Sequence, residues 1–237
     1  MRTLSSSDFL DLWEQGFRLH PLDQGLLVLG AALPETSYEA LSDWPLGRRN
    51  QALAKLRCSC FGPNLQGWIC CTRCGEKLEF ETDGRAIAEG AADAEESLSE
   101  PIVVKGRSFR LPTSRDLAQA AQESDARSAA IRLMESCRVE AGESPVWSEE
   151  DLEEVGQRMA VADPMAEILL KLCCPTCDNQ WNAALDIAAF LWAEIEARAK
   201  RLIFEVHALA SAYGWTEKEI LSLSEHRRAL YLATVHG

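Results

Sequence analysis

Apolar side chains recur every three, four or seven residues towards the end of the chain. This spacing matches the 3.6-residue period of an α-helix and predicts one long helix with a single apolar face from residue 187 onward. At 1.5 Å per residue such a helix extends about 40 Å. The apolar positions are Ile187, Leu191, Ile195, Leu202, Val206, Leu209 and Tyr213.

The C-terminal region 187–237 is predicted to be this long helix followed by short helices. Gly214 ends the long helix, since glycine readily adopts the left-handed conformation found after helix C-termini. Thr216 and Glu219 have the spacing of a capping box for a short helix, and Ser224 caps the last one. Two interpretations of the apolar stripe remain. It packs against the N-terminal helices, or it presents a surface to a partner.

Three aromatic side chains of this region are candidates for partner contacts. Trp192 lies off the apolar stripe, and Trp215 and Tyr231 belong to the segments that follow the long helix. Tryptophan and tyrosine are enriched among the residues that carry most of the binding energy at protein interfaces. We therefore expect Trp192, Trp215 and Tyr231 to bind a partner.

Residues 1–62 alternate helical apolar runs with short polar breaks and predict an N-terminal helical block. One helix begins after Pro45 and ends near Phe61-Gly62-Pro63. Asp23 is placed to cap another. The helices are expected over residues 7–16 and 21–33, over the segment SYEALSDW, and after Pro45.

Residues 84–164 predict an insertion of mixed structure. It starts within the acidic, alanine-rich stretch Glu76–Glu100, whose latter part we expect to be a mobile loop because it contains few large apolar residues. The segment PIVVKGRSFRLP then predicts a β-hairpin that turns at Lys105-Gly106. Helices follow, with Thr113 or Ser114 as one cap, Ser148 as another, and Pro164 as the final break.

Two similar cysteine motifs lie far apart in the chain: CCTRCGE begins at Cys70 and CCPTCDN at Cys173. Short alternating, strand-like segments flank both motifs, so each predicts the tight turn of a β-hairpin, within 63–83 and 165–186. A Cys-x-x-Cys turn directs two thiolates at one point, and two such turns complete the shell of a tetrahedral zinc ion. The sequence therefore predicts a four-cysteine zinc ribbon. The predicted ligands are Cys71, Cys74, Cys174 and Cys177.

The doubled first cysteine of each motif leaves a choice of ligand. Successive strand residues face opposite sides, so only one of Cys70 and Cys71, and one of Cys173 and Cys174, can face the metal. We favour the members of the Cys-x-x-Cys pairs. Scattered buried cysteines and a thioredoxin-like redox motif are weaker interpretations, since the redox motif requires a following helix and strand-like residues follow here.

The nine cysteines and the net charge of −13 narrow the classes of function. An odd number of cysteines suits metal binding or burial in a reducing compartment better than disulfides. Cys58 and Cys60 are expected to be core or surface thiols, and Cys137 to be buried. The acidic balance argues against nucleic acid and anionic membranes as partners. No apolar run is long enough to span a membrane and the N-terminus lacks a signal-peptide core, so we expect a cytoplasmic protein.

The sequence contains no recognisable catalytic arrangement. His20, His207, His226 and His236 have no serine or cysteine partner in a known nucleophile pattern, and no glycine-rich phosphate-binding motif occurs. A zinc ion held by four thiolates has no open position for water or substrate, so its role is structural. We therefore expect a protein that is not an enzyme.

Several blocks of the sequence resemble one known family. They are RLHPLDQGLLVLGAAL, PLGRRNQALAKLR, CTRCGEKLEFE, FRLPTSRDLAQAA and, most specifically, CPTCDNQWNAALDIAAFLWAEIEARAKRLIFEVHALASAYGWTEKEILSLSEHRRALYL. Over nearly its whole length the chain resembles zinc-knuckle proteins related to the baseplate protein family of contractile-tailed phages, found in gene clusters for contractile tails and extracellular contractile injection systems. Thr72 stands where the family's knuckle commonly has proline, which only rigidifies the turn.

The resemblance implies a structural or assembly protein, a chaperone or adaptor, of the baseplate–hub region of a contractile injection system. Its partners would be baseplate, hub or other tail subunits. The alternative is a zinc-ribbon regulatory module that binds nucleic acid or a polymerase, which the charge near the motifs disfavours. There Arg73, Lys77 and Lys171 are outweighed by Glu76, Glu79, Glu81 and Asp178. The predicted fold class is α+β, mainly helical, with the two hairpins as zinc knuckles.

Overall fold

The computed structural model describes residues 1–90, 101–140 and 146–236, which form two compact units. Unit 1 consists of Met1–Pro34 and Ala189–Gly237, and unit 2 of Glu35–Ala188. Helices account for 58% of the described residues and strands for 15%, which confirms the mainly helical prediction. The predicted mobile loop lies largely at 91–100, outside the described residues. None of the described helices combines the length and the apolar character needed to cross a membrane.

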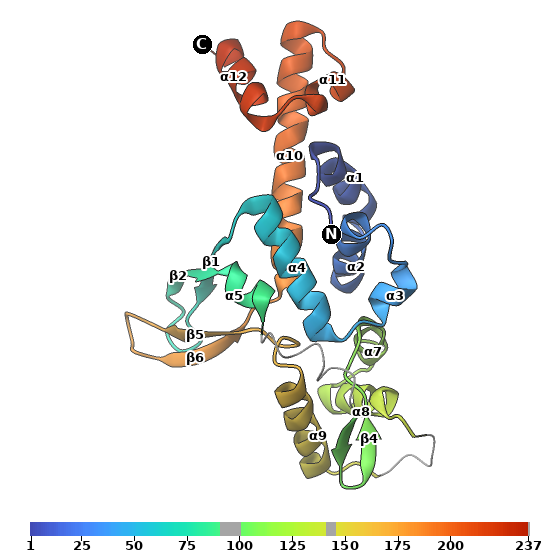
Figure 1. Ribbon diagram of the computed structural model, residues 1–237. Helices are drawn as coiled ribbons and strands as arrows, with labels where there is room; N and C mark the ends of the chain where they lie inside the picture. The colour runs from blue at the N-terminus through green and yellow to red at the C-terminus, as the bar shows by residue number, and fades with distance from the viewer. Residues whose placement is uncertain (91–100, 141–145, 237) are drawn as a thin grey trace. The chain divides into compact units, whose positions relative to one another are not determined.

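Unit 1 is built from helices at the two ends of the chain (Figure 1). The helices are α1 (Ser6–Gly16), α2 (Pro21–Ala32), α10 (Ile187–Tyr213, whose first two residues belong to unit 2), α11 (Glu217–Ser222) and α12 (Glu225–His236). The long C-terminal helix is therefore confirmed. So is its predicted end, because Gly214 has a φ of +70° and Thr216 and Glu219 form the capping box of α11.

The apolar stripe of α10 lies in the core of unit 1. Leu191 is 1% exposed, and Ile195, Leu202 and Leu209 are fully buried. Tyr213, at the end of the stripe, is 39% exposed. Most of the stripe therefore packs within the protein, and only its end at Tyr213 is exposed.

Trp192 also lies in this core, and its contact with a partner stays a prediction. Its side chain is only 8% exposed. The indole lies against Gly16, where an added Cβ would come within 2.3 Å of the Trp192 Cη2 atom. The absent side chain at Gly16 makes room for the large indole, which reaches the core from a position off the stripe.

A buried ion pair joins α12 to α10. Arg228 is 1% exposed, and its Nε atom donates to Oε2 of Glu205 at 2.9 Å. The same guanidinium donates to the carbonyl oxygen of Leu223 and to Oγ of Ser6. Removing one member of such a pair costs about 3–5 kcal/mol, because the other charge is left buried. Helix α12 is thus an integral part of unit 1.

Unit 2 contains the remaining elements (Figure 1). Its helices are α3 (Tyr38–Ser42), α4 (Leu46–Phe61), α5 (Gly84–Glu89), α7 (Ser114–Ala120), α8 (Ala126–Cys137) and α9 (Glu149–Ala162). Its antiparallel pairs are β1 (Asn64–Cys70) with β2 (Lys77–Asp83), β3 (Ile102–Val104) with β4 (Arg107–Phe109), and β5 (Leu169–Cys173) with β6 (Gln180–Ala184). All three predicted hairpins are therefore present.

Hydrogen bonds to residues more than a hundred positions later in the sequence fix the start of helix α4. Its own N-cap residue supplies no side-chain hydrogen bond. Instead Asp163, which is 4% exposed, accepts from the Gly47 N–H through Oδ2 at 2.8 Å. Asn50 donates to the carbonyl oxygen of Met165 at 2.9 Å. Burial raises the pKa of Asp163, while the N–H groups of Gly47 and Met165 favour its charged form. These contacts bring the segment before β5 to the start of α4.

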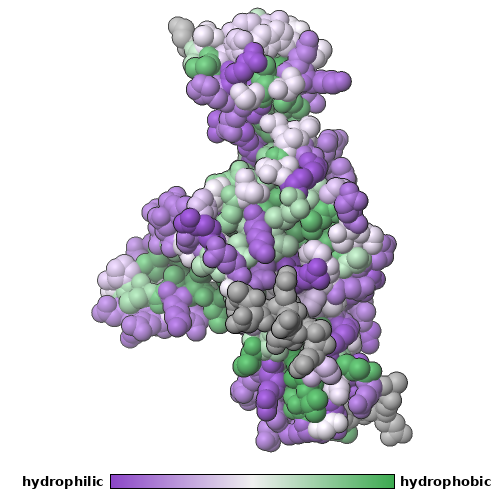
Figure 2. All heavy atoms as spheres, viewed as in Figure 1, coloured by the Kyte–Doolittle hydropathy of each residue, from purple (hydrophilic) through white to green (hydrophobic). Residues whose placement is uncertain are grey.

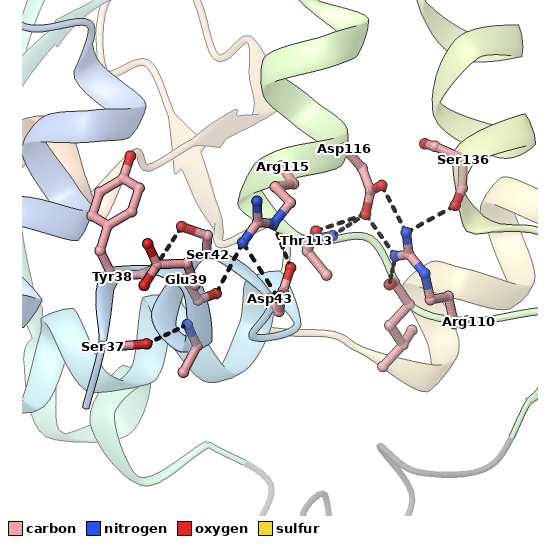
Figure 3. A network of polar contacts seen from close by, with 12 residues as sticks. Ser37, Tyr38, Glu39, Ser42, Asp43, Arg110, Thr113, Arg115, Asp116 and Ser136 are labelled. Atoms are coloured by element: carbon pink, nitrogen blue, oxygen red, sulfur yellow. Dashed lines mark hydrogen bonds and ion pairs between the residues drawn. The ribbon is translucent and has the colours of Figure 1, made fainter. Parts of the chain in front are cut away.

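A second polar network joins the strands and helices of the insertion (Figure 3). Arg110 donates to both oxygens of Asp116, at 2.6 and 2.8 Å, and the Thr113 N–H donates to the same carboxylate. Burial alone would raise the pKa of Asp116, but these hydrogen bonds outweigh it and hold the pKa below its usual value. Thr113 is therefore the cap of α7. Arg115 pairs with Asp43 at 2.6 Å, which links α7 to the end of α3.

Two local predictions need correction. Helix α5 occupies part of the stretch for which a loop was expected, because Ile87 and Ala88 are 7% and 6% exposed and give the helix a small apolar face. Helix α2 is capped by His20 and not by Asp23, since Nδ1 of His20 accepts from the Leu22 N–H at 3.3 Å. Histidine is not among the usual capping residues, so no residue pattern pointed to this cap.

The packing of Trp192 on Gly16 can be tested with two alanine substitutions. We expect Gly16→Ala to lower the free energy of unfolding by about 1–3 kcal/mol, because the new methyl group meets the indole. Gly156→Ala in α9 is the matched control, since an added Cβ there meets nothing within 4 Å. It should leave stability unchanged or raise it by up to about 1 kcal/mol. Thermal unfolding followed by circular dichroism measures both, and equal effects would contradict the packing.

Candidate metal centre

The two cysteine motifs form turns at the ends of two hairpins of unit 2. Cys71 and Cys74 lie between β1 and β2, and Cys174 and Cys177 between β5 and β6. All four Sγ atoms lie within 4.8 Å of one another. Sγ of Cys71 is 3.7 Å from that of Cys177, and Sγ of Cys74 is 3.6 Å from that of Cys174. The four predicted ligands therefore come together and could hold a metal ion.

The sulfur positions fit a tetrahedral ion. Four sulfur atoms bound at about 2.3 Å to a central ion lie about 3.8 Å from one another. The separations of 3.7 Å for Cys71 and Cys177 and 3.6 Å for Cys74 and Cys174 are close to this spacing. Across the described ranges 1–90, 101–140 and 146–236, no second group of three or more cysteine, histidine or carboxylate side chains converges in this way.

The two turns share one backbone pattern. In the first, the Cys71 N–H donates to the carbonyl oxygen of Glu76 at 2.8 Å, and the Gly75 N–H donates back to that of Cys71 at 2.9 Å. The second turn repeats both bonds at 2.9 Å between the corresponding residues. The residue after each second cysteine is left-handed, with φ of +76° at Gly75 and +52° at Asp178. Glycine and aspartate are among the residues that adopt this conformation most easily.

Backbone groups of the first turn favour the thiolate form of Cys71. The N–H groups of Cys74 and Arg73 point at its Sγ atom and lower its pKa to about 6. The thiolate is the form of cysteine that binds metal. Asn179, which the sequence analysis did not single out, connects the two turns: its Nδ2 atom donates to Oγ1 of Thr72 at 3.2 Å and lies 3.9 Å from Sγ of Cys71.

The other cysteines lie outside the cluster. Cys70 and Cys173 are exposed strand residues, so the preference for the second cysteine of each doublet agrees with the geometry. Cys58 and Cys60 are half-buried at the end of α4. Cys137 is fully buried, as predicted, and burial raises its pKa to about 12. It therefore remains a neutral thiol.

Below the cysteine turns the two hairpins present half-buried apolar residues. Ile69 and Leu78 lie on the first hairpin, and Leu172 and Trp181 on the second. Figure 2 shows apolar residues gathered over this part of the molecule, at the left of the view, with hydrophilic residues around them. An ion bound between the turns would therefore fix the relative placement of two apolar hairpin faces.

The predicted partner residues Trp215 and Tyr231 lie in unit 1, in contact with each other and with Tyr213. Ring centroids are 4.7 Å apart for Tyr213 and Trp215 and 4.9 Å apart for Trp215 and Tyr231. The hydroxyl group of Tyr213 lies 2.8 Å from Oγ1 of Thr234. These contacts join the end of α10 to α12. Both predicted side chains are half-buried, and their contact with a partner stays a prediction.

Substitution of one cysteine in each turn tests the ligand assignment. We expect the double variant Cys74→Ser, Cys177→Ser to lose nearly all bound metal, because only two thiolates remain. Cys70→Ser, Cys173→Ser is the matched control, with the same chemistry at the exposed neighbouring strand positions. It should keep the metal content of the unchanged protein, about one ion per chain. Elemental analysis by mass spectrometry measures both, and equal loss in the control would contradict the assignment.

Comparisons with models of protein families, with curated proteins and with solved structures find no match. The function argued below therefore depends on the residues of the chain, on their arrangement, and on the resemblance of its sequence blocks.

Proposed function

We propose that the cysteine cluster binds one structural zinc ion and that the chain is a non-enzymatic structural or assembly protein of the baseplate–hub region of a contractile injection system. The observation that carries the first part is the donor set, which consists of four cysteines from two matching turns. The second part rests on the sequence resemblance. Baseplate, hub or other tail subunits are the proposed partners.

The donor set favours zinc over other ions. Thiolate sulfur selects zinc, copper(I) or iron–sulfur clusters, whereas calcium and magnesium take oxygen ligands. Two Cys-x-x-Cys turns at hairpin ends are typical of zinc ribbons, in which a single ion is four-coordinate. The single point defined by four Sγ atoms within 4.8 Å of one another suits one ion.

A zinc ion with four thiolate ligands supports a structural role. Its coordination shell has no open position for water or substrate, so it neither activates a nucleophile nor polarises a carbonyl group. Its binding free energy is instead available for folding, at about 10–16 kcal/mol for structural zinc in small domains. An isolated two-stranded hairpin is marginally stable in water, so the ion would supply the stability that each hairpin lacks.

The proposed role in a contractile injection system rests mainly on the C-terminal sequence block, in which the resemblance is most specific. This stretch forms β6, α10, α11 and α12. On α10, Phe204 and Ile203 are 74% and 44% exposed, and on α12 Leu230 is 56% exposed. Exposed apolar side chains on well-packed helices are suited to binding another subunit. We place the partner contact of unit 1 on these residues and on Trp215 and Tyr231.

Point variants test this contact better than truncation does. Removing α12 would leave Glu205 without Arg228, its buried partner, and would destabilise unit 1 whatever α12 binds. Phe204→Ser replaces an exposed side chain and should leave folding unchanged, since exposed positions usually contribute within about 0.5 kcal/mol. Loss of function in this variant would therefore report on binding.

Deletion of the gene in a producing strain tests the proposed function. We expect no assembled, sheathed particles by electron microscopy, although the other subunits are still made. The unchanged gene should restore particles, and the Cys74→Ser, Cys177→Ser double variant should not, because its hairpins lose their common anchor. The Cys70→Ser, Cys173→Ser variant should restore them. Normal particles in the deletion strain would contradict the assembly role.

A regulatory zinc ribbon would give a different result. Filter binding at low salt would then detect association of the purified protein with DNA or RNA, since phosphate contacts dominate such affinities. We expect none, because Glu79 and Glu81 lie exposed on the hairpin that carries Lys77. Tight binding of either nucleic acid would favour the alternative.

A further inference from the structure

The two cysteine hairpins correspond residue by residue when they are aligned on Cys71 and Cys174. The residues six positions before these cysteines, Leu65 and Ile168, are 0% and 6% exposed, so both hairpins bury the same inner position. The residues three positions before them are Trp68 and Lys171, and both are exposed. The common hairpin structure therefore accepts a lysine at the position where the first hairpin has tryptophan.

Trp68 is thus not required for the hairpin to form. Its side chain is 63% exposed, which is unusual for the largest apolar residue. Lys77 lies over its ring, with the Nζ atom 4.2 Å from the ring centroid. Lys77 lies diagonally across the strand pair, because Trp68 pairs with Glu79 and Cys70 with Lys77. The ring face already holds a cation and can hold another in its place.

The surface around Trp68 is hollowed and carries acidic groups. An open hollow of about 500 Å³ is lined by residues that include Trp68, Gln66, Lys77, Glu79 and Glu81. Glu79 and Glu81 are exposed, and the amide of Gln66 donates to Glu81 at 3.3 Å. Two carboxylates beside an aromatic face suit a guanidinium group, which stacks on the ring and pairs with a carboxylate in the same plane.

One edge of strand β1 pairs with no other strand of the described residues. Among the strands that the structure describes, β1 pairs only with β2. An extended peptide can add to such an edge through main-chain hydrogen bonds and place alternate side chains on one face. On the outer face a side chain of a segment beside β1 would then lie next to Trp68, and a long side chain such as arginine would extend across the ring towards Glu79 on β2.

We propose that the outer face of the β1–β2 hairpin, formed by Gln66, Trp68, Lys77, Glu79 and Glu81, is a docking site for an extended, arginine-bearing segment of a partner subunit. An arginine of the partner takes the place of Lys77 over the Trp68 ring and pairs with Glu79. The net charge of −13 favours approach of a basic segment. This inference rests on the proposed function, because that function identifies the partner as a subunit of the injection machine.

A peptide assay tests the chemistry of the site. The probe is a short fluorescein-labelled peptide that alternates arginine with threonine, and the matched probe has citrulline, which is uncharged and of the same shape, in place of arginine. Fluorescence anisotropy at low salt should show binding of the arginine probe and at least about tenfold weaker binding of the citrulline probe. Equal affinities, or no binding of the arginine probe, would overturn the proposal.

Variants of the two hairpins locate the binding. Trp68→Lys copies the residue found at the corresponding position of the second hairpin, so the hairpin should fold and keep its metal. We expect it to weaken binding of the arginine probe at least about tenfold. Lys171→Ala, at that corresponding position, is the control and should leave binding unchanged. Glu79→Gln should weaken binding and reduce its dependence on salt. Unchanged binding in Trp68→Lys would overturn the site, as would binding of single-stranded DNA that depends on Trp68.

The same variant separates this inference from the proposed function in cells. If the deletion strain forms no particles and Trp68→Lys, made at normal level and with normal metal content, fails to restore them, both are supported. If Trp68→Lys restores particles as well as the unchanged gene does, the docking site is wrong and the assembly role stands. If the deletion strain forms normal particles, the assembly role itself is wrong.

Discussion

Four sulfur atoms from two turns of unit 2 lie within 4.8 Å of one another, and they bring together two hairpins that are far apart in the sequence. Cys74 and Cys174 are 100 positions apart, so the chain between them is a loop closed at the cluster. Closing so long a loop costs only slightly more free energy than closing a short one, because the cost rises with the logarithm of length. Two hydrogen bonds at the start of α4 close loops of similar length: the Gly47 N–H donates to Asp163, and Asn50 donates to the carbonyl oxygen of Met165.

The sequence predicts the features that depend on local spacing. The stripe from Ile187 predicts α10 because a long periodic pattern is unambiguous, and two Cys-x-x-Cys motifs predict the cluster because few other arrangements use them. The rest depends on partners distant in sequence. Neither Trp192 against Gly16 nor Arg228 with Glu205 leaves a periodic signal, and α5 is too short to show one.

The two faces of the first cysteine hairpin have separate roles in this account. Its inner face carries Leu65 and packs within unit 2, while its outer face carries Trp68 and is exposed. The second hairpin also buries the corresponding inner residue, Ile168, but has a lysine, Lys171, in place of Trp68 on its outer face. A zinc ion would hold both hairpins in place and orient the outer face without touching a partner. The proposed adaptor role thus needs a rigid site with no open coordination position.

X-ray absorption spectroscopy of the purified protein at the zinc edge tests the central claim most directly. It reports the identity, number and distance of the atoms around the ion without depending on a variant that folds poorly. The account predicts zinc with four sulfur neighbours at about 2.3 Å and no nitrogen or oxygen neighbour. A folded protein without zinc, or zinc with nitrogen or oxygen ligands and an open position, would contradict a closed structural site formed by Cys71, Cys74, Cys174 and Cys177.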